Sequence, residues 1–254
     1  MKQPSDNDPL FIGWADTPPA DRRFFMRTGL GLTAAAGALG FGLAALQQSP
    51  GTGRWDPDAV REWRGIVSAE PYAMLRTLDL GGGPRTALLS CLGKCGVAAR
   101  IGSLTGQAVV VKGSLIQRGR HSMIAVDEQG DWIRRLDGTI ADPALHFPSH
   151  QPLGEVHLIG EILDSKCWFG AMRPSSGKVH KACAALCIRG GIPPAFFARG
   201  PANQGVLMIM MTGGRPHGPT LLELVADPVR VSGRVLQMGD LLLLDAAVSQ
   251  IRRI

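Results

Sequence analysis

The sequence predicts a mainly β protein in which an N-terminal transmembrane helix precedes two similar small barrels. Three observations support this prediction. Glycine and proline are frequent, with 33 and 18 residues, and aromatic residues make up only 6% of the chain, a composition that favours short strands joined by tight turns. Residues 28–46 contain no charged side chain. The rest of the chain contains an internal repeat, which indicates two copies of one structural unit.

The N-terminal region resembles a twin-arginine export signal. Residues 21–27 read DRRFFMR, with Arg22 and Arg23 as the arginine pair, and the uncharged segment follows at once. An ordinary arginine pair beside a membrane span is the alternative. The resemblance implies export of a folded protein, often with a cofactor already bound.

The charges around the uncharged segment predict the topology. Residues 1–27 are expected to form a cytoplasmic segment, and residues 28–46 a transmembrane or signal helix that is about long enough to cross a bilayer. Because the positive charges precede the span, its N-terminal side is expected in the cytoplasm. We therefore expect a single-pass protein of the cytoplasmic (inner) membrane with its C-terminal domains in the periplasm. An uncleaved anchor is favoured over cleavage near Gly42-Leu43-Ala44.

The internal repeat defines the domains. Displacing the sequence by 120 residues aligns the stretch from Thr86 with the stretch from Val206 without a gap. The identical pairs are Gly93/Gly213, Leu104/Leu224, Val109/Val229, Val111/Val231, Gly113/Gly233, Gln117/Gln237 and Gly119/Gly239. Their shared order predicts two equivalent domains at residues 62–142 and 154–254, joined by a Pro-containing linker at residues 143–153.

Both copies predict the same strands. The expected strands are residues 65–68, 87–92 and 109–115 in the first copy and residues 156–163, 206–211 and 229–235 in the second, each followed by a fourth strand after Gly119 or Gly239. The V-x-V-x-G segments alternate in the way that is typical of half-buried strands. Four or five short antiparallel strands with one interposed helix fit a small closed barrel of the OB type.

The second copy carries a Cys/His-rich insertion between its first two strands. Residues 164–194 hold three of the five cysteines and one of the six histidines. A short helix is expected here, capped at its start by Ser175 or Ser176 and ended by Gly190-Gly191.

On this helix, His180, Cys183 and Cys187 lie at positions i, i+3 and i+7 and therefore share one face. Cys167 precedes the helix by a loop long enough to fold back. A Cys3His set suits a tetrahedral zinc ion or an iron–sulfur centre, and Asp164 is expected to orient His180 from behind the metal ligands. Two alternatives stay open: a disulfide between loop and helix, or buried thiols that pack as small apolar side chains.

Cys91 and Cys95 are the remaining cysteines. They flank a tight turn of the first copy, whereas the aligned residues of the second copy are Met211 and Arg215. This spacing fits a local disulfide, part of a secondary metal site, or an inert buried cysteine beside a turn residue.

These motifs resemble a group of bacterial exported small OB-like β-barrel proteins. The shared pattern is D-x-x-C at the end of a strand, then G-K-x-H-x-x-C-A-x-x-C on a helix, then a G-G-I-P turn. The matching positions are Asp164, Cys167, Gly177, His180, Cys183, Cys187, Gly190, Gly191 and Pro193. The resemblance implies the fold and the site of the second half and names no reaction.

The functional expectation follows from export and site chemistry. We expect a membrane-anchored periplasmic accessory or electron-transfer protein that holds a metal or redox centre beside a periplasmic or membrane oxidoreductase complex. A non-catalytic protein-binding module stiffened by disulfides is the alternative. A thiol enzyme is least favoured because the chain has no C-x-x-C motif. Nucleic acid is not an expected partner, because few aromatic side chains are present to stack on bases.

Overall fold

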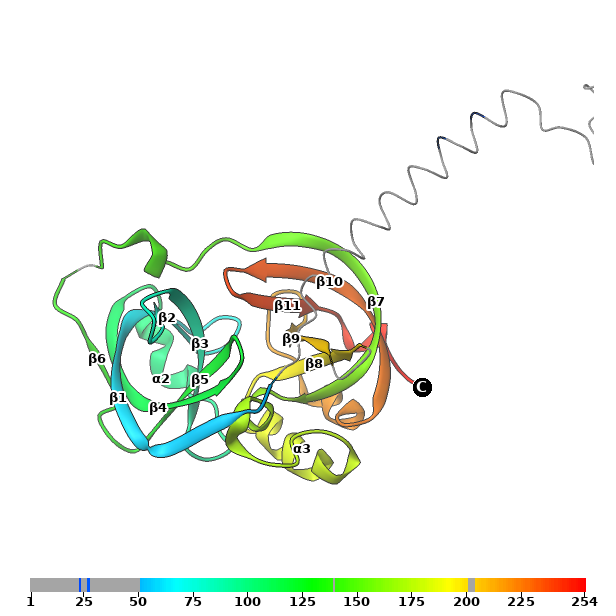
Figure 1. Ribbon diagram of the computed structural model, residues 1–254, viewed down its shortest axis with the longest axis horizontal. Helices are drawn as coiled ribbons and strands as arrows, with labels where there is room; N and C mark the ends of the chain where they lie inside the picture. Colours follow the sequence, from blue (N-terminus) through cyan, green and yellow to red (C-terminus); the bar gives the residue numbers. More distant parts are fainter. Residues whose placement is uncertain (1–22, 24–26, 28–50, 139, 201–203) are drawn as a thin grey trace, which may run out of the picture. The chain divides into compact units, whose positions relative to one another are not determined.

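The computed structural model describes residues 51–138, 140–200 and 204–254, together with Arg23 and Arg27 (Figure 1). The described residues from 51 onwards belong to one unit. Among the described residues, no helix has both the length and the apolar character needed to span a bilayer. The predicted membrane span at residues 28–46 lies outside the described part of the chain.

The first half forms a five-stranded barrel with a sixth strand at its edge (Figure 1). Its strands are β1 (Arg54–Ser68), β2 (Met74–Leu78), β3 (Pro84–Cys91), β4 (Ala108–Arg118), β5 (His121–Val126) and β6 (Ile133–Arg135). The order is β1-β2-β3-β5-β4, and β4 pairs with β1. Only β3 and β5 pair in parallel. The short helix α2 (Ala98–Ile101) and the 3-10 turn η1 (Gly102–Leu104) connect β3 with β4.

The second half repeats this barrel. Its strands are β7 (Gln151–Asp164), β8 (Pro194–Arg199), β9 (Gly205–Met211), β10 (Pro228–Met238), β11 (Leu241–Asp245) and β12 (Ile251–Arg253). The order β7-β8-β9-β11-β10 closes through β10 and β7, and β9 and β11 pair in parallel. The 3-10 helix η6 (Pro219–Leu224) takes the place of α2 and η1. The prediction of a mainly β chain with two OB-like barrels is therefore confirmed.

Equivalent pairings confirm the duplication. Ser114 pairs with Ala125 in the first barrel, and Arg234 pairs with Asp245 in the second. Gly113 and Gly233 occupy matching positions, where an added Cβ would lie 2.5 Å from the Ala125 carbonyl oxygen and 2.8 Å from that of Asp245. Only glycine allows the backbones to approach so closely at both positions.

The alignment without a gap is wrong in β9. Leu88 pairs with Met123 in the first barrel, but Ile209 and not Met208 pairs with Leu243 in the second. Leu88 and Ile209 are also the residues of these strands that face the same core. The stretch from Ile209 to Val229 is thus one residue shorter than the equivalent stretch from Leu88 to Val109.

Several boundaries differ from those predicted. Strand β1 begins at Arg54 and β7 at Gln151, so both barrels start before residues 62 and 154 and the linker is displaced. Strands β2 and β8 were not among the predicted strands. Strand β8 begins at Pro194, only a few residues after the predicted helix end at Gly190-Gly191. Proline is compatible with the first residue of a strand because a missing N–H costs little there.

The two barrels pack together through a shared apolar cluster, which is separate from the core inside the first barrel. Equivalent outward-facing positions contribute to this shared cluster: Ile116 and Leu236 in β4 and β10, and Met123 and Leu243 in β5 and β11. Tyr72, between β1 and β2, donates a hydrogen bond to the Met210 carbonyl oxygen across this contact at 2.7 Å. The barrels therefore pack face to face through the same surface of each.

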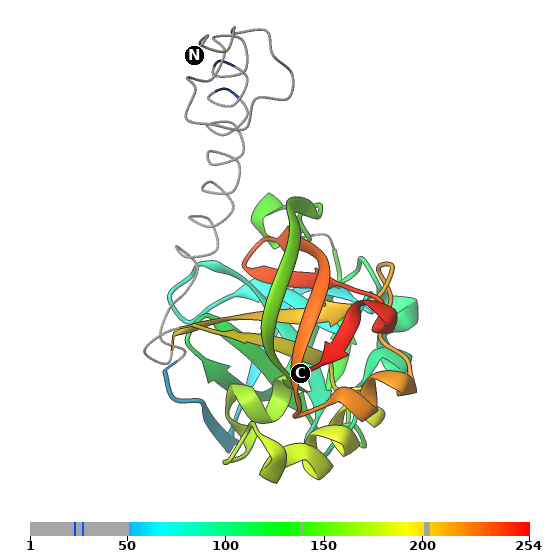
Figure 2. The same cartoon turned by 90° about the vertical axis from the view of Figure 1, so that its right-hand side faces the viewer.

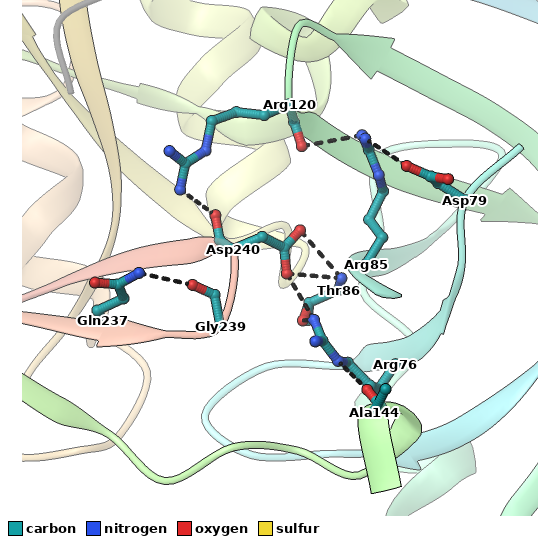
Figure 3. Close-up of polar contacts among 9 residues, drawn as sticks. All are labelled: Arg76, Asp79, Arg85, Thr86, Arg120, Ala144, Gln237, Gly239 and Asp240. Atoms are coloured by element: carbon teal, nitrogen blue, oxygen red, sulfur yellow. Dashed lines mark hydrogen bonds and ion pairs between the residues drawn. The ribbon is translucent and has the colours of Figure 1, made fainter. Parts of the chain in front are cut away.

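An acidic residue closes one edge of this contact (Figure 3). The Asp240 carboxylate, in the turn between β10 and β11, accepts hydrogen bonds from Arg76 Nη1 at 2.8 Å and from the Thr86 backbone N–H at 3.0 Å. Arg120, in the equivalent turn of the first barrel, donates to the Asp240 carbonyl oxygen. These bonds connect the β10–β11 turn of the second barrel with the first barrel.

Candidate functional site

The Cys/His insertion connects β7 with β8 and begins at a buried aspartate. Asp164 is the last residue of β7 and has no exposed surface. Its Oδ1 accepts a hydrogen bond from the Cys167 backbone N–H at 2.8 Å. The chain then makes a π-type turn, η3 (Cys167–Ala171), that ends through Gly170 at a φ of 147°. Asp164 thus directs Cys167 inward as the strand ends.

The helix follows at the foot of the second barrel (Figure 1 and Figure 2). It consists of a 3-10 turn, η4 (Lys178–His180), and α3 (Lys181–Arg189). The predicted serine cap is wrong, because neither segment has a side-chain cap from Ser175 or Ser176. Instead the carboxylate of Glu161, in β7, accepts the Gly177 N–H, which also places a negative charge near the positive end of the helix.

The helix ends as predicted. Gly191 N–H donates to the Ile188 carbonyl, Ile192 N–H donates to the Cys187 carbonyl, and Gly191 has a φ of 98°. This is the Schellman arrangement that glycine favours.

His180 hydrogen-bonds to the same aspartate. Its Nε2 lies 2.9 Å from Asp164 Oδ2, and the histidine is only 2% exposed. Asp164 therefore makes the predicted contact with His180 and also accepts the Cys167 backbone N–H. A buried carboxylate on one imidazole nitrogen fixes the ring and leaves the other nitrogen for a ligand.

The structure brings the predicted ligands together. One ligand atom each from Cys167, His180 and Cys183 lie within 4.8 Å of one another, and the same limit holds for Asp164, Cys167 and Cys187. The Cys167 and Cys183 sulfurs are 4.0 Å apart. All three cysteines are free thiols, Cys167 and Cys187 buried and Cys183 half-buried. Cys167, which comes from outside the helix, belongs to both groups.

The thiols are electrostatically coupled. The Cys167 thiol donates to the Cys187 sulfur, which lowers the pKa of Cys187 and raises that of Cys167. A hydrogen bond to Cys183 raises the pKa of Lys94. Negative charge is therefore favoured on Cys187 and disfavoured on Cys167, and a metal that binds Cys167 would have to displace its proton.

Lys166 connects this cluster with the first barrel. Its side chain is buried, and its Nζ donates hydrogen bonds to the carbonyl oxygens of Cys91, Leu92 and Gly93 at 2.6, 2.8 and 2.6 Å. The Nζ also lies 5.3 Å from the ring centroid of Trp55. Burial lowers the pKa of Lys166 to about 8.

Cys91 and Cys95 form a disulfide with an S–S distance of 2.00 Å. Of the interpretations left open by their spacing, the local disulfide is therefore confirmed. The disulfide closes the turn whose carbonyl oxygens receive Lys166. A C-x3-C pair of the first barrel thus supports the Cys/His loop of the second.

Two glycines allow these loops to meet. The Gly96 N–H donates to the Gly190 carbonyl at 2.8 Å. A Cβ on Gly190 would lie 1.8 Å from the Lys94 carbonyl oxygen, and one on Gly96 would lie 2.5 Å from that of Gly191. The glycines of the G-G-I-P turn are therefore required by the contact between barrels as well as by the helix end.

Aromatic residues form a second anchor for the loop. The His121 ring, in β5, stacks on Phe169 with centroids 5.6 Å apart and meets the edge of Trp168 at the same distance. Burial lowers the pKa of His121 to about 3. Arg118 lies over Trp168 at 4.4 Å. No spacing in the sequence pointed to these contacts or to Lys94 and Lys166, although the concentration of lysines near the cysteines was a signal.

Comparisons with known proteins add no family. No family model matches the chain, and no curated protein matches it either. Among solved structures, a deletion mutant of the single-stranded DNA binding protein from Thermus aquaticus is 14% identical over 82% of this chain and 90% of its own, with a TM-score of 0.22. A similarity at this level supports no conclusion about fold or function, so the barrel assignment depends on the strand pairings.

Proposed function

We propose that Cys167, His180, Cys183 and Cys187 bind a single metal ion. The observation that carries this proposal is that Cys167 belongs to two compact groups of candidate ligands, one with His180 and Cys183 and the other with Asp164 and Cys187. Thiolate ligands at about 2.3 Å from one tetrahedral ion lie about 3.8 Å apart, and the Cys167 and Cys183 sulfurs are 4.0 Å apart. Asp164, bonded to His180, would orient the imidazole in the way that carboxylates support metal-bound histidines.

Zinc fits this set better than an iron–sulfur centre. A cluster places several iron and sulfide atoms between its ligands, whereas the atoms of each group here lie within 4.8 Å of one another. Three thiolates and one imidazole form a complete tetrahedral set, which is typical of structural zinc sites. A single iron in the same set would retain the electron-transfer function that the sequence suggests.

The metal would stabilise the connection between the barrels. The loop that carries the ligands also carries Lys166 and Phe169, which contact the first barrel. We infer an accessory protein rather than an enzyme, held at the periplasmic side of the inner membrane beside an oxidoreductase complex. Support for that location and partner comes from the twin-arginine-like N-terminus.

The alternative is a metal-free binding module stiffened by disulfides. The Cys91–Cys95 disulfide favours this binding module, whereas the three free thiols of the Cys/His insertion favour a metal-binding protein.

Cobalt substitution tests the proposal. Protein produced in medium supplemented with Co²⁺ should carry one ion per chain, with the visible absorption of tetrahedral cobalt thiolate, and Zn²⁺ should displace it. His180→Ala should weaken binding by about 10–100-fold or more, as loss of a ligand exceeds loss of a supporting contact. His150→Ala, at an exposed histidine in the linker, is the matched control. Cobalt that binds weakly, or equally to both variants, would exclude this site.

A further inference from the structure

The outer side of the Cys/His loop carries an apolar patch. Val179, Leu186 and Met172 are 84%, 50% and 42% exposed; we call them the α3 patch. Val179 and Leu186 lie four residues before and three residues after Cys183, so they share its helix face. The Met172 sulfur lies 3.5 Å from the Cys183 sulfur. The three side chains of the patch therefore flank the half-buried Cys183, one of the candidate metal ligands.

The patch is not explained by packing within the chain. The residues of α3 that face the protein are Ala184 and Cys187, which are small and buried. Leu186 of α3 and Val179 of η4 are exposed instead. Single exposed apolar residues are common on soluble proteins, but a contiguous patch with a polar rim is typical of an interaction site.

The rim of the patch is basic. Residues 165–193 contain five basic side chains and no acidic one. Lys166 donates to carbonyls of the first barrel, and Lys181 pairs with Asp227. Arg173, Lys178 and Arg189 are exposed, and among the described residues none of them forms an ion pair. Lys94, on the disulfide turn, adds a further exposed charge.

We propose that the α3 patch and its basic rim are the docking surface for an acidic face of a protein partner. Apolar residues at the centre and charges at the rim are the usual anatomy of such an interface, and opposite charge on the partner would steer the encounter. An anionic membrane surface fits less well. The helix has only nine residues, and the patch contains no Trp or Phe to enter a lipid interface.

The consequence concerns the half-buried Cys183. A partner on the patch would cover it and exclude water from the exposed side of the cluster. The proposal does not require a bound metal, since patch and rim belong to the polypeptide.

Site-specific photo-crosslinking tests it. The full chain, in the cells that naturally make it, would carry a benzophenone amino acid at Val179 or at Leu186. Matched controls at Ile159 and Leu80, which are 53% and 67% exposed, present apolar positions elsewhere. Both patch positions should form an adduct with a protein whose crosslinked segment is rich in Asp and Glu, and the controls should not.

Charge reversal supplies the second arm. Lys178→Glu with Arg189→Glu should lower the adduct yield about tenfold or more while the melting temperature and metal content stay unchanged. If that variant fails to fold, Lys178→Gln with Arg189→Gln replaces it. No adduct, an adduct with lipid, an adduct with a second copy of this chain, or a yield insensitive to charge would each overturn the proposal. Metal content measured on the same samples reports separately on the proposed function.

Discussion

In the first barrel, residues 69–73 connect β1 with β2, whereas the equivalent connection of the second barrel, between β7 and β8, spans residues 165–193. Both connections meet the other barrel. The short one does so through Tyr72, whose hydroxyl donates to the Met210 carbonyl and accepts from the His217 backbone N–H. The long one does so through Lys166, two aromatic rings and the glycines of its G-G-I-P turn. Equal scaffolds can therefore differ in chemistry because one loop has room to collect ligands and the other does not.

The comparison also separates two uses of cysteine. The first barrel has a disulfide within one turn, and the second has three free thiols brought together from a loop and a helix. The disulfide turn is the surface on which the thiol loop lies. One copy thus provides a stiff platform and the other provides the site.

The largest expected effect comes from Cys167, the ligand that belongs to both groups. Cys167→Ser should abolish metal binding and lower the free energy of unfolding by about 4 kcal/mol or more, as expected when a structural metal site is lost. Elemental analysis and thermal melts would measure both changes. Ser165→Ala, at a buried neighbour, is the control. Unchanged metal content in Cys167→Ser would show that the long connection of the second barrel does not bind a metal through Cys167.

A smaller loss is expected at the glycine contact. Gly190→Ala should destabilise the chain by about 3 kcal/mol, because its Cβ would lie 1.8 Å from the Lys94 carbonyl oxygen. Gly102→Ala is matched, since nothing lies within 4 Å of its Cβ and its φ of −51° suits alanine. Urea unfolding of both variants measures the difference. Equal stability would mean that the loops do not touch.

The disulfide should contribute less. Replacing Cys91 and Cys95 together by Ser should cost about 2 kcal/mol, the chain-entropy value for so short a loop. The metal should stay bound, but amide hydrogen exchange at residues 165–190 should accelerate, because Lys166 loses an ordered set of acceptors. If exchange became faster only in the first barrel, the disulfide turn would not stabilise the Cys/His insertion of the second barrel.

The effect that is smallest at neutral pH, and grows only in acid, concerns the protonation of His121. His121 keeps its neutral form in the folded chain down to about pH 3, whereas in the unfolded chain it accepts a proton below about pH 6.5. Its contribution to stability is therefore fully present above pH 6.5 and declines as the pH falls towards 3, by about 1.4 kcal/mol per unit. His121→Phe should flatten this part of the stability curve, and His150→Asn should not. Parallel curves for all three chains would exclude His121 as the cause.

Much of the scaffold could be predicted from local pattern. The alternation in β4 and β10 and the glycines at Gly113 and Gly233 identified the duplicated barrels, since these features repeat in order along the chain. Strands β2 and β8 were not predicted, because a strand of five or six residues shows little periodicity and a proline such as Pro194 is typical of turns. The register of β9 was not predicted. Because the second copy is one residue shorter between the paired residues of β9 and β10, the identity of Gly93 and Gly213 in the alignment is a coincidence.

Part of the candidate site could likewise be predicted from local sequence, and part could not. Helical spacing placed His180, Cys183 and Cys187 on one face, and the length of the preceding loop allowed Cys167 to join them. The support from Lys166 and the disulfide turn lies 73–75 residues away in sequence, and only packing of the two barrels brings it close. Membrane anchoring at residues 28–46 stays a prediction.

The central claim is that the long connection of the second barrel holds one metal ion on three cysteines and a histidine. X-ray absorption at the zinc edge, on full-length protein purified without chelator, tests it most directly. If Cys167, His180, Cys183 and Cys187 bind the ion, we expect about one zinc per chain, with three sulfur neighbours at about 2.3 Å and one nitrogen at about 2.0–2.1 Å. Metal-free protein, or a zinc shell of oxygen and nitrogen alone, would contradict it.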